Sequence, residues 1–500
     1  MKHIVSVQLT KNGPKYLQIT EQITRQINEA VLLPGDKLPP IRKFAEQLGV
    51  NSATIVKAYE TLQNRDLVLK IQGSGVYVGG SGNHDTNTHH DDDLNDDELY
   101  LDDEIDLMQH GSIKIGKAAI NFATSTPTSD MFPVAPFKKA INEVLDRDGG
   151  KVFEYNESNG YLPLRRSICT LLRDSYTIET SVERLQIISG AQQGIDIAAK
   201  ALLTPGDSVL VEDPTYTGAL AVFKSRGARI AGVPMLSDGI DLVYLEKSIQ
   251  FYRPRVLYVM SDFQNPTTYS YSEEKRKALI TLAQKYTFYI IEDDYLSDLS
   301  FSNADRPKPL KAYDNPLNQR VIYIKSFSKL LMPGLRIGFL TAPKRICRDI
   351  LQAKHLTDIA SSGLIQRAFD DYLRSGVWKK HIQQMCSRYE KRHTTLAASI
   401  RTRMPGSIQE SIPEGGFSLW LPLPSDVSAA QVYKAAAKRG ILCTPGNVFR
   451  AGKRDFDDHI RLSIAAVDET LIDKGIQILS EVIEELQDHT GMEEFISPLM

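Results

Sequence analysis

Five short runs rich in β-branched and aromatic residues recur along the chain, each separated from the next by a stretch long enough for a helix. In chain order they read RLQIIS, DSVLVED, RVLYVMSD, TFYIIEDD and RVIYIKS. Apolar runs of this length predict buried strands, and strands that alternate with helices predict βα units in a mostly parallel sheet. Such sheets bind ligands at the carboxyl ends of their strands, so the residues after each run are the candidates for a functional site.

The most informative strand end follows RVIYIKS. Ser326, Ser328 and Lys329 stand there, and Arg336 comes seven residues after the lysine. A lysine amine can form a Schiff base, while hydroxyls and a guanidinium can hold a phosphate, so this combination predicts a pyridoxal 5′-phosphate (PLP) site. The segment Ser326-Phe-Ser-Lys329 also fits the S-x-x-K pattern of penicillin-recognising serine enzymes, but the S-D-N and K-T-G companions of that pattern are absent from the sequence.

Two further strand ends suit the phosphate and the ring of such a cofactor. Gly190, Ala191 and Gln192 open a predicted helix, whose first backbone N–H groups attract phosphate. Tyr216 follows DSVLVED, and its ring could cover one face of the pyridine. A core position is the alternative explanation for the tyrosine.

The remaining two strand ends carry groups for the polar edge of the ring. Asn265 could donate to the 3-oxygen of the cofactor, and Tyr295 could hydrogen-bond the same atom. Asp293, held against the ring nitrogen, would keep it protonated and ready to accept electrons. Taken singly, Asn265 with its proline could be a turn and Asp293 a helix cap.

In this order, and ahead of Lys329 and Arg336, these segments resemble fold-type I aminotransferases over about residues 118–490. The resemblance implies an α/β PLP-dependent domain with a mostly parallel central sheet, a large subdomain at about 120–370 and a small C-terminal α/β subdomain at about 371–490. It also implies that Arg461, in HIRLSIA, grips a substrate carboxylate, although an exposed arginine on an edge strand is the alternative. The segment YNESNGYLPLRRSI matches a region that helps to build a shared site between subunits, which implies a homodimer.

Residues 1–79 have a different pattern. Ile19, Ile23, Ile27 and Val31 predict a helix over 16–31, IRKFAEQLG predicts a second helix that ends at Gly49, and ATIVKAYETLQNRD predicts a third. Asn51 or Ser52 can cap the third helix, and LVLKIQGSGVYVG predicts two strands around a Gly-Ser-Gly turn. Helix, helix, turn, helix, hairpin is the α+β order of a winged helix-turn-helix.

The run PGDKLPPIRKFAEQLGVNSATIVKAYETL, followed by GSGVYV, resembles the DNA-binding domain of the GntR family across nearly all of residues 12–79. The resemblance implies that the third helix enters the major groove and that the hairpin approaches the minor groove. The family usually has an arginine where this chain has Ser52, which leaves the preferred bases open. A protein-interaction module is the alternative, because small three-helix domains are common. The residues expected to contact DNA are Arg42, Asn51, Ser52, Thr54, Lys57, Gly73 and Ser74.

Between this head and the body at 114–500, residues 80–113 predict a flexible acidic linker. Residues 80–106 contain eleven aspartates and glutamates and no lysine or arginine. Three histidines, His84, His89 and His90, precede three aspartates and could bind a divalent metal, but acidic runs of this kind are usually solvated, so we predict no metal site. The acidic residues could also compete with DNA for the head.

The sequence shows no sign of a membrane span, a secretion signal or a disulfide framework. No apolar run approaches the length of a membrane span, and the N-terminal stretch MKHIVSVQLTKNG lacks the apolar segment of a signal peptide, so a cytoplasmic protein without a membrane partner is expected. The four cysteines are scattered without a C-x-x-C motif, which favours reduced thiols.

Head and body together resemble the MocR/GabR family of bacterial transcription regulators. The resemblance implies that an amino compound, or PLP itself, is sensed through aldimine exchange at Lys329, and that a homodimer binds an operator with paired half-sites in double-stranded DNA. Because Lys329, Asp293 and Arg461 are all present, slow or genuine aminotransferase activity stays open. The alternatives are a working aminotransferase, converting an amino acid to a 2-oxo acid, with an accessory DNA-binding domain, and a structural PLP protein with neither role.

Overall fold

The computed structural model describes residues 7, 9, 14–28, 31–32, 36–64, 67–71, 75–78, 120–301, 306–404, 413–452 and 459–496. The chain forms two compact units, an N-terminal unit within Met1–Leu94 and a C-terminal unit within Asn95–Met500. The predicted linker at 80–113 lies outside the described residues. Within the described ranges, no helix combines the length and the apolar composition needed to cross a membrane.

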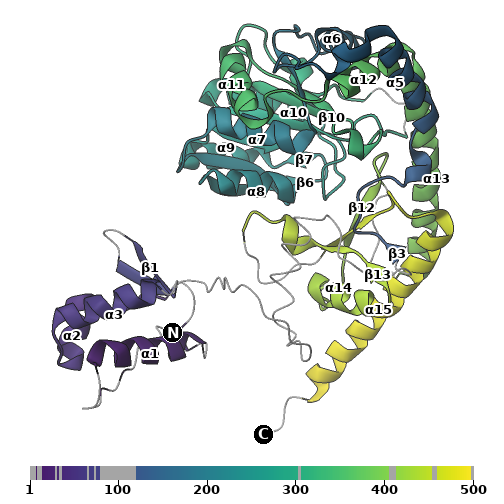
Figure 1. The fold of residues 1–500 in the computed structure, drawn as a ribbon. Helices are drawn as coiled ribbons and strands as arrows, with labels where there is room; N and C mark the ends of the chain where they lie inside the picture. The colour runs from purple at the N-terminus through teal and green to yellow at the C-terminus, as the bar shows by residue number, and fades with distance from the viewer. Residues whose placement is uncertain are drawn as a thin grey trace. The chain divides into compact units, whose positions relative to one another are not determined.

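Among its described residues, the N-terminal unit contains three helices and a hairpin (Figure 1), namely α1 (Lys15–Asn28), α2 (Ile41–Leu48), α3 (Ser52–Asn64), β1 (Val68–Ile71) and β2 (Gly75–Val78). Ile19 and Ile23 bury the apolar face of α1, which packs against α3. Val31 lies beyond the end of α1 and is 46% exposed, so the predicted helix was too long. The order of elements confirms the predicted winged helix-turn-helix.

The turn between α2 and α3 is set by two residues. Gly49 ends α2 in a left-handed conformation with φ of 62°, which costs glycine little because it has no Cβ. Asn51 then caps α3, since its Oδ1 accepts a hydrogen bond from the backbone N–H of Ala53 at 2.9 Å. The two helices are thereby joined by a short, defined turn.

The C-terminal unit is built on an eight-stranded sheet with the order β4-β11-β10-β9-β8-β5-β6-β7. Neighbours from β6 through β5, β8 and β9 to β10 are parallel, whereas β11 runs antiparallel to β10 and β4, and β7 antiparallel to β6. The mostly parallel sheet is confirmed, and each of the five predicted runs contributes a strand. The strands are β4 (Leu185–Ile188), β5 (Ser208–Asp213), β6 (Arg229–Leu236), β7 (Gly239–Ile240), β8 (Val256–Val259), β9 (Tyr289–Asp294), β10 (Val321–Ser326) and β11 (Gly338–Thr341).

Helices cover both faces of this sheet. Val209 and Val211 of β5 pack into a cluster with α7, α8 and α11, whereas Leu210 between them packs into a cluster with α9 and α10. A fully buried side chain of this size contributes about 1.5–3 kcal/mol, so the alternation fixes the register of the strand. The helices are α5 (Val134–Asp148), α6 (Leu162–Tyr176), α7 (Ala191–Leu202), α8 (Thr217–Ser225), α9 (Leu242–Tyr252), α10 (Glu273–Tyr286), α11 (Cys347–Asp358) and α12 (Gly363–Arg374).

A smaller subdomain follows, and its three-stranded sheet has the order β12-β15-β14. Its long helix α13 packs against α15 and also against α12 of the large subdomain (Figure 1). β3 (Ile120–Asn121), although it opens the C-terminal unit, pairs in parallel with β13 of this subdomain. Among the described residues, the strands and α-helices of this subdomain are β12 (Ser418–Pro422), β13 (Ile441–Leu442), β14 (Thr444–Pro445), β15 (His459–Ser463), α13 (Val377–Arg403), α14 (Ala429–Lys438) and α15 (Glu469–Ile496).

Candidate functional site

A cavity of about 500 Å³ lies at the carboxyl ends of the central strands, between the two subdomains of the C-terminal unit. Nine of the residues singled out in the sequence line it, namely Ala191, Gln192, Tyr216, Asn265, Asp293, Tyr295, Ser326, Lys329 and Arg461. Side chains from five strand ends and from β15 therefore meet at one place. Parallel strands bring their carboxyl ends to the same edge of a sheet, which explains the convergence.

Lys329 follows β10 and projects into this cavity, where its Nζ donates a hydrogen bond to Thr126 Oγ1 at 3.2 Å. Burial lowers the pKa of the amine to about 8, and the positive charges of Arg461 and Arg336 act in the same direction. A lower pKa increases the fraction of neutral amine at physiological pH, and the neutral amine is the nucleophile. The lysine is thus suited to covalent chemistry with a carbonyl group.

Asp293, at the end of β9, is a buried carboxylate with one oxygen unsatisfied. Its Oδ2 accepts a hydrogen bond from the Tyr258 hydroxyl at 2.8 Å, whereas Oδ1 is buried without a partner among the described residues. Burial raises the pKa of this carboxyl to about 7, against the opposing effect of the Tyr258 hydrogen bond. A buried acceptor without a donor is costly, so the site fits a ligand that brings a proton-bearing nitrogen to Oδ1.

Gly190, Ser328 and Arg336 form a cradle next to the cavity. A Cβ on Gly190 would stand 3.1 Å from Arg336 Nη2 and 3.5 Å from Ser328 Oγ, so glycine leaves the space between these groups open. Ser328 Oγ is buried without a hydrogen-bond partner, and Arg336 makes no ion pair with a carboxylate of the described chain. An unpaired hydroxyl and cation beside the start of α7 match the donor set that a phosphate requires.

Tyr216 and Gln192 close one side of the cavity. The Tyr216 hydroxyl donates to Gln192 Oε1 at 3.2 Å, and Gln192 Nε2 donates to the carbonyl oxygen of Gly218 at 3.0 Å. A Cβ on Gly218 would lie 2.4 Å from Gln192 Oε1 and 2.5 Å from Tyr216 Cζ, so only glycine allows this approach. The contact fixes the aromatic ring at the cavity wall, consistent with its predicted place beside the cofactor ring.

Arg461, on β15, is a buried cation without a carboxylate partner among the described residues. Its Nη1 donates to Asn265 Oδ1 at 3.0 Å, and its Nη2 donates to the carbonyl oxygen of Ala123 at 2.8 Å and to Thr444 Oγ1 at 3.1 Å. Its Nε has no partner, and burial lowers the pKa of the guanidinium to about 10. Since a buried charge without a counterion is unfavourable, this arginine suits a ligand carboxylate.

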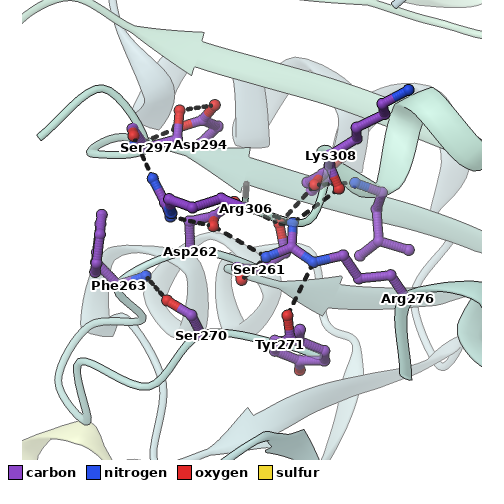
Figure 2. Close-up of polar contacts among 12 residues, drawn as sticks. Ser261, Asp262, Phe263, Ser270, Tyr271, Arg276, Asp294, Ser297, Arg306 and Lys308 are labelled. Carbon is purple, nitrogen blue, oxygen red and sulfur yellow. Dashed lines mark hydrogen bonds and ion pairs between the residues drawn. The ribbon is translucent and has the colours of Figure 1, made fainter. Parts of the chain in front are cut away.

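Two arginines donate hydrogen bonds to the carboxylate of Asp262, which lies three residues before Asn265 in the chain (Figure 2). Arg276 donates to the two oxygens of Asp262 at 2.9 and 3.1 Å, and Arg306 donates to Asp262 Oδ1 at 2.6 Å. Arg306 also lies over the Phe263 ring at 4.6 Å. The Tyr295 hydroxyl donates to the Phe263 carbonyl oxygen at 2.9 Å, so in this state that hydroxyl is engaged by the protein.

Several residues of the site were not found from the sequence. Thr126, Thr444 and Phe449 line the cavity, and Tyr258 supports Asp293. Tyr258 lies within an apolar run and resembles a core residue, whereas the other three come from distant segments without a recognisable motif. Only the signal of a hydroxyl-rich stretch, ATST at 123–126, could have marked the first of them.

The predicted DNA-contacting residues concentrate on one helix of the N-terminal unit. Along α3 and its cap, Asn51, Ser52 and Lys57 are exposed and Thr54 is half-buried. The Lys57 ammonium lies 4.3 Å from the centroid of the Tyr16 ring of α1, a cation–π contact. The side chain of Arg42, which lies on α2, and residues Gly73 and Ser74 fall outside the described residues.

Comparisons with known proteins separate the same two parts of the chain. A family model described as aminotransferase class I and II matches residues 117–479, and one described as bacterial regulatory proteins, gntR family, matches residues 15–78. Aromatic-amino-acid aminotransferase 1 of Thermococcus litoralis is 32% identical over 371 residues, which cover 73% of this chain and 88% of that protein.

Two further relatives extend the comparison. The uncharacterized HTH-type transcriptional regulator YcxD of Bacillus subtilis is 28% identical over 471 residues, which cover 93% of this chain and 99% of the relative. The solved structure of Pyrococcus horikoshii kynurenine aminotransferase in complex with PMP has a TM-score of 0.71 and 30% identity, and the match covers 78% of this chain and 97% of that one. The predicted combination of a GntR-type domain with an aminotransferase-type domain is confirmed.

Proposed function

The chain belongs to the aminotransferase class I and II family and carries a gntR-family domain at its N-terminus, and on this premise we propose that it is a PLP-dependent, DNA-binding transcriptional regulator. One observation carries the proposal, the match to an HTH-type regulator over 99% of that relative's length. An aminotransferase without a regulatory role has no need for residues 15–78. In our proposal the C-terminal unit senses a small amino compound, or PLP itself, and the N-terminal unit binds DNA.

The unsatisfied groups of the cavity support PLP as the cofactor. Gly190, Ser328 and Arg336, with Ser326 beside them, would hold its phosphate, and Tyr216 would cover its ring. When bound, PLP supplies an aldehyde that bonds reversibly to amines and a pyridine ring that accepts electrons.

The other polar residues of the cavity act on protons and on the ligand. Asp293 Oδ1 would share a proton with the ring nitrogen, which satisfies its buried lone pairs. Lys329, with its pKa lowered to about 8, provides a partly neutral amine for covalent attachment. Asn265 and Tyr295 line the same cavity and would hydrogen-bond the ring 3-oxygen, the tyrosine after its hydroxyl leaves the carbonyl oxygen of Phe263.

Arg461 defines the class of effector that the cavity would accept. A carboxylate on the effector would supply the missing counterion of this buried guanidinium, while the effector amine would meet the cofactor at Lys329. An amino acid, or a related compound with both an amine and a carboxylate, satisfies both requirements. The effector can shift the protein between states only by as much as its affinity for those states differs.

The proposal is tested by selecting binding sites from random-sequence DNA with the full-length, PLP-loaded protein. We expect enrichment of a motif with two half-sites, because a dimer presents two copies of α3. The dissociation constant of the selected DNA is then measured with and without a panel of amino compounds that includes GABA and β-alanine. A shift produced by one compound identifies the effector, whereas failure to enrich any sequence would contradict a regulatory role.

A second function, aminotransferase activity, is favoured by the presence of Lys329, Asp293 and Arg461 around one cavity. These residues would allow an amino group to be exchanged with a 2-oxo acid. The same panel of compounds, incubated with a 2-oxo acid acceptor, distinguishes the two functions. Accumulation of product over many turnovers, without selection of DNA, would identify a metabolic enzyme with an accessory DNA-binding domain.

The proposal includes an assembly and a location. We propose a homodimer, supported by the aromatic side chains of Phe153 and Tyr155, which are 73% and 91% exposed on the described surface. We propose domain boundaries at residues 79 and 113 with an acidic linker between them, and action in the cytoplasm, where bacterial DNA is accessible. Light scattering of the purified protein measures the assembly, and a monomer at micromolar concentration would exclude the dimer.

A further inference from the structure

Phe449 lies against the guanidinium that is proposed to bind the effector carboxylate. It ends the short helix η6 (Gly446–Phe449), lines the cavity and is 2% exposed. The Cζ atom of Arg461 lies 5.0 Å from the centroid of the Phe449 ring, within the range of a cation–π contact. An aromatic ring and a buried cation are therefore paired at the cavity wall.

The ring compensates the charge of Arg461 in a different way from the hydrogen bonds around it. Within the described part of the chain, the N–H groups of Arg461 donate to neutral acceptors, on Asn265, Ala123 and Thr444. The face of an aromatic ring carries partial negative charge, so it attracts a cation without occupying one of its N–H groups. The guanidinium is thereby stabilised and held against the ring, while it stays able to donate to a carboxylate.

The Phe449 ring is itself held in place from both subdomains. In the small subdomain it makes a T-shaped contact with Trp420 of β12, with the ring centroids 5.9 Å apart and an angle of 83° between the rings. Trp420 stands opposite Arg461 in the pairing of β12 with β15, so their side chains lie on one face of that sheet. The carbonyl oxygen of Phe449 accepts a hydrogen bond at 2.8 Å from the backbone N–H of Thr215 in the large subdomain. A ring fixed in this way can orient the cation that lies on it.

We propose that Phe449 is a positioning residue, which orients the Arg461 guanidinium and thereby makes the site select amino compounds that carry a carboxylate; this inference rests on the proposed function. Recognition of a carboxylate by arginine requires the planar guanidinium to face both oxygens. Loss of the aromatic face would let the guanidinium turn toward its neutral acceptors. The preference for a carboxylate would then weaken, with little effect on the binding of the rest of the ligand.

Two stable ligands isolate the contribution of the carboxylate. N-(5′-phosphopyridoxyl)-L-alanine and N-(5′-phosphopyridoxyl)ethylamine share the phosphate, the ring and the linking amine, and they differ only in the carboxylate. The full-length protein, freed of PLP with hydroxylamine and dialysed, is titrated with each ligand in a calorimeter. The ratio of the dissociation constant of the ethylamine ligand to that of the alanine ligand measures the preference for the carboxylate. Hydrogen bonds between a carboxylate and a buried cation correspond to a wild-type ratio of about ten- to a hundredfold.

Two substitutions of Phe449 separate its aromatic face from its bulk. Phe449→Leu keeps an apolar side chain and removes the ring, so the ratio should fall by about three- to tenfold. Phe449→Tyr keeps the ring and should stay within about twofold of the wild-type ratio. The dissociation constant of the ethylamine ligand should change little in both variants, because that ligand has no carboxylate for Arg461. Equal weakening of both ligands by Phe449→Leu would mean that Phe449 only supports the cavity wall, and it would overturn the inference.

The same substitution in a protein without the guanidinium tests whether Phe449 acts through Arg461. In an Arg461→Gln background, Phe449→Leu should leave the ratio unchanged. A further fall of the ratio in that background would mean that the ring acts on the ligand directly, which would overturn the inference. Phe449→Met, which also lacks the ring, replaces Phe449→Leu if circular dichroism shows that the leucine variant is unfolded.

The outcomes distinguish this inference from the proposed function. A high wild-type ratio that survives Phe449→Leu overturns the inference and leaves the proposed function intact. A wild-type ratio near unity overturns the effector class assigned to Arg461 and the inference with it. A protein that binds neither ligand has no PLP site, which overturns the proposed function as a whole.

Discussion

At the scale of single residues, the burial of the Asp293 carboxyl destabilises the folded protein, because one of its oxygens has no hydrogen-bond partner among the described residues. Its carboxyl is buried, one oxygen lacks a partner, and burial raises its pKa to about 7. Burial also raises the pKa of two neighbouring carboxyls, Glu212 to about 8 and Glu292 to about 7. Strongly shifted carboxyls beside a cavity are typical of functional sites, where a ligand restores the missing partner.

This cost makes the stability of the cofactor-free protein depend on pH. The pKa of Asp293 is about 7 in the folded state against a reference of 3.8, so the folded state binds the proton more tightly and stability falls as pH rises from about 4 to 7. Asp293→Asn removes this loss and still accepts the Tyr258 hydrogen bond. We expect it to stabilise the cofactor-free protein by about 2–4 kcal/mol at pH 8 and by little at pH 4, measured by denaturant unfolding.

Asp146→Asn, at an exposed position of α5, is the matched control and should change stability little at any pH. Glu212 and Glu292 keep their own raised pKa values in the Asp293 variant, so a weaker pH dependence of the same sign should remain. If Asp293→Asn changed the free energy of unfolding equally at pH 4 and at pH 8, the raised pKa of Asp293 would be contradicted.

Lys329 allows a second prediction at this scale. Lys329→Ala should bind PLP without a covalent bond, because no other residue that lines the described cavity carries a primary amine. Mass spectrometry after borohydride reduction should therefore show the cofactor mass on the wild type and none on the variant. Circular dichroism checks that the variant is folded. A reducible adduct on the alanine variant would assign the covalent bond to a different lysine.

At the scale of secondary-structure elements, the strands were predictable where they are buried on both faces. Each residue of β8, β9 and β10 is buried, and such strands appear in the sequence as continuous apolar runs. β6 was not found, because it contains a glycine and a proline and most of its residues are half-buried or exposed. β11 was not found because its four residues, GFLT, include only two large apolar side chains, whereas the equally short β8 is VLYV.

The sequence predicted those residues of the cavity that directly follow a recognisable strand. Tyr216, Asn265, Asp293 and Lys329 follow recognisable strands, so their convergence follows from parallel topology. Thr126 and Thr444 reach the cavity from segments that no local pattern connects with it, and tertiary pairing of β3 and β14 places them there. Local sequence therefore identified the large-subdomain wall of the cavity, whereas most of the opposite wall required the folded structure.

The helix α3 carries a prediction of its own. Lys57 is exposed on α3 and supported by the Tyr16 ring, so its charge is available to a DNA phosphate. Lys57→Ala should weaken binding to the selected DNA uniformly across sequences, by about three- to tenfold, and reduce the slope of log affinity against log salt by about one. Lys57→Arg, measured in the same way, keeps the charge and should retain most of the affinity.

The absorbance of the bound cofactor should be identical in Lys57→Ala and the wild type, because α3 belongs to the other compact unit. A changed cofactor spectrum in the absence of DNA would argue against independent folding of the two units. If the slope of log affinity against log salt concentration were unchanged in Lys57→Ala, Lys57 would not contact a DNA phosphate.

At the scale of the whole molecule, charge is divided unevenly along the chain. Residues 1–79 hold ten lysines and arginines against six acids, whereas residues 80–106 hold eleven acids and no lysine or arginine. An acidic stretch covalently attached to a basic DNA-binding unit acts at high effective concentration. It is therefore expected to compete with DNA for that unit.

Neutralising the acids at 91–106 with asparagine and glutamine keeps the length and removes the charge. The variant should bind DNA several-fold more tightly at low salt, and the gain should disappear as salt screens the competition. Fluorescence anisotropy over a salt series measures both effects. Equal affinity of wild type and variant at low salt would exclude competition by this segment.

The pairing of β3 with β13 also has a consequence for biosynthesis. β3 leaves the ribosome early, but its partner at Ile441–Leu442 emerges only after most of the chain has been made. The N-terminal unit needs none of these later residues and can fold first, since domains generally fold as they emerge. A messenger RNA truncated before the codons of β13 would therefore encode the N-terminal unit together with a C-terminal unit that lacks Arg461. Under the proposed function, such a fragment would keep the DNA-binding unit and lose the residue proposed to bind the effector carboxylate.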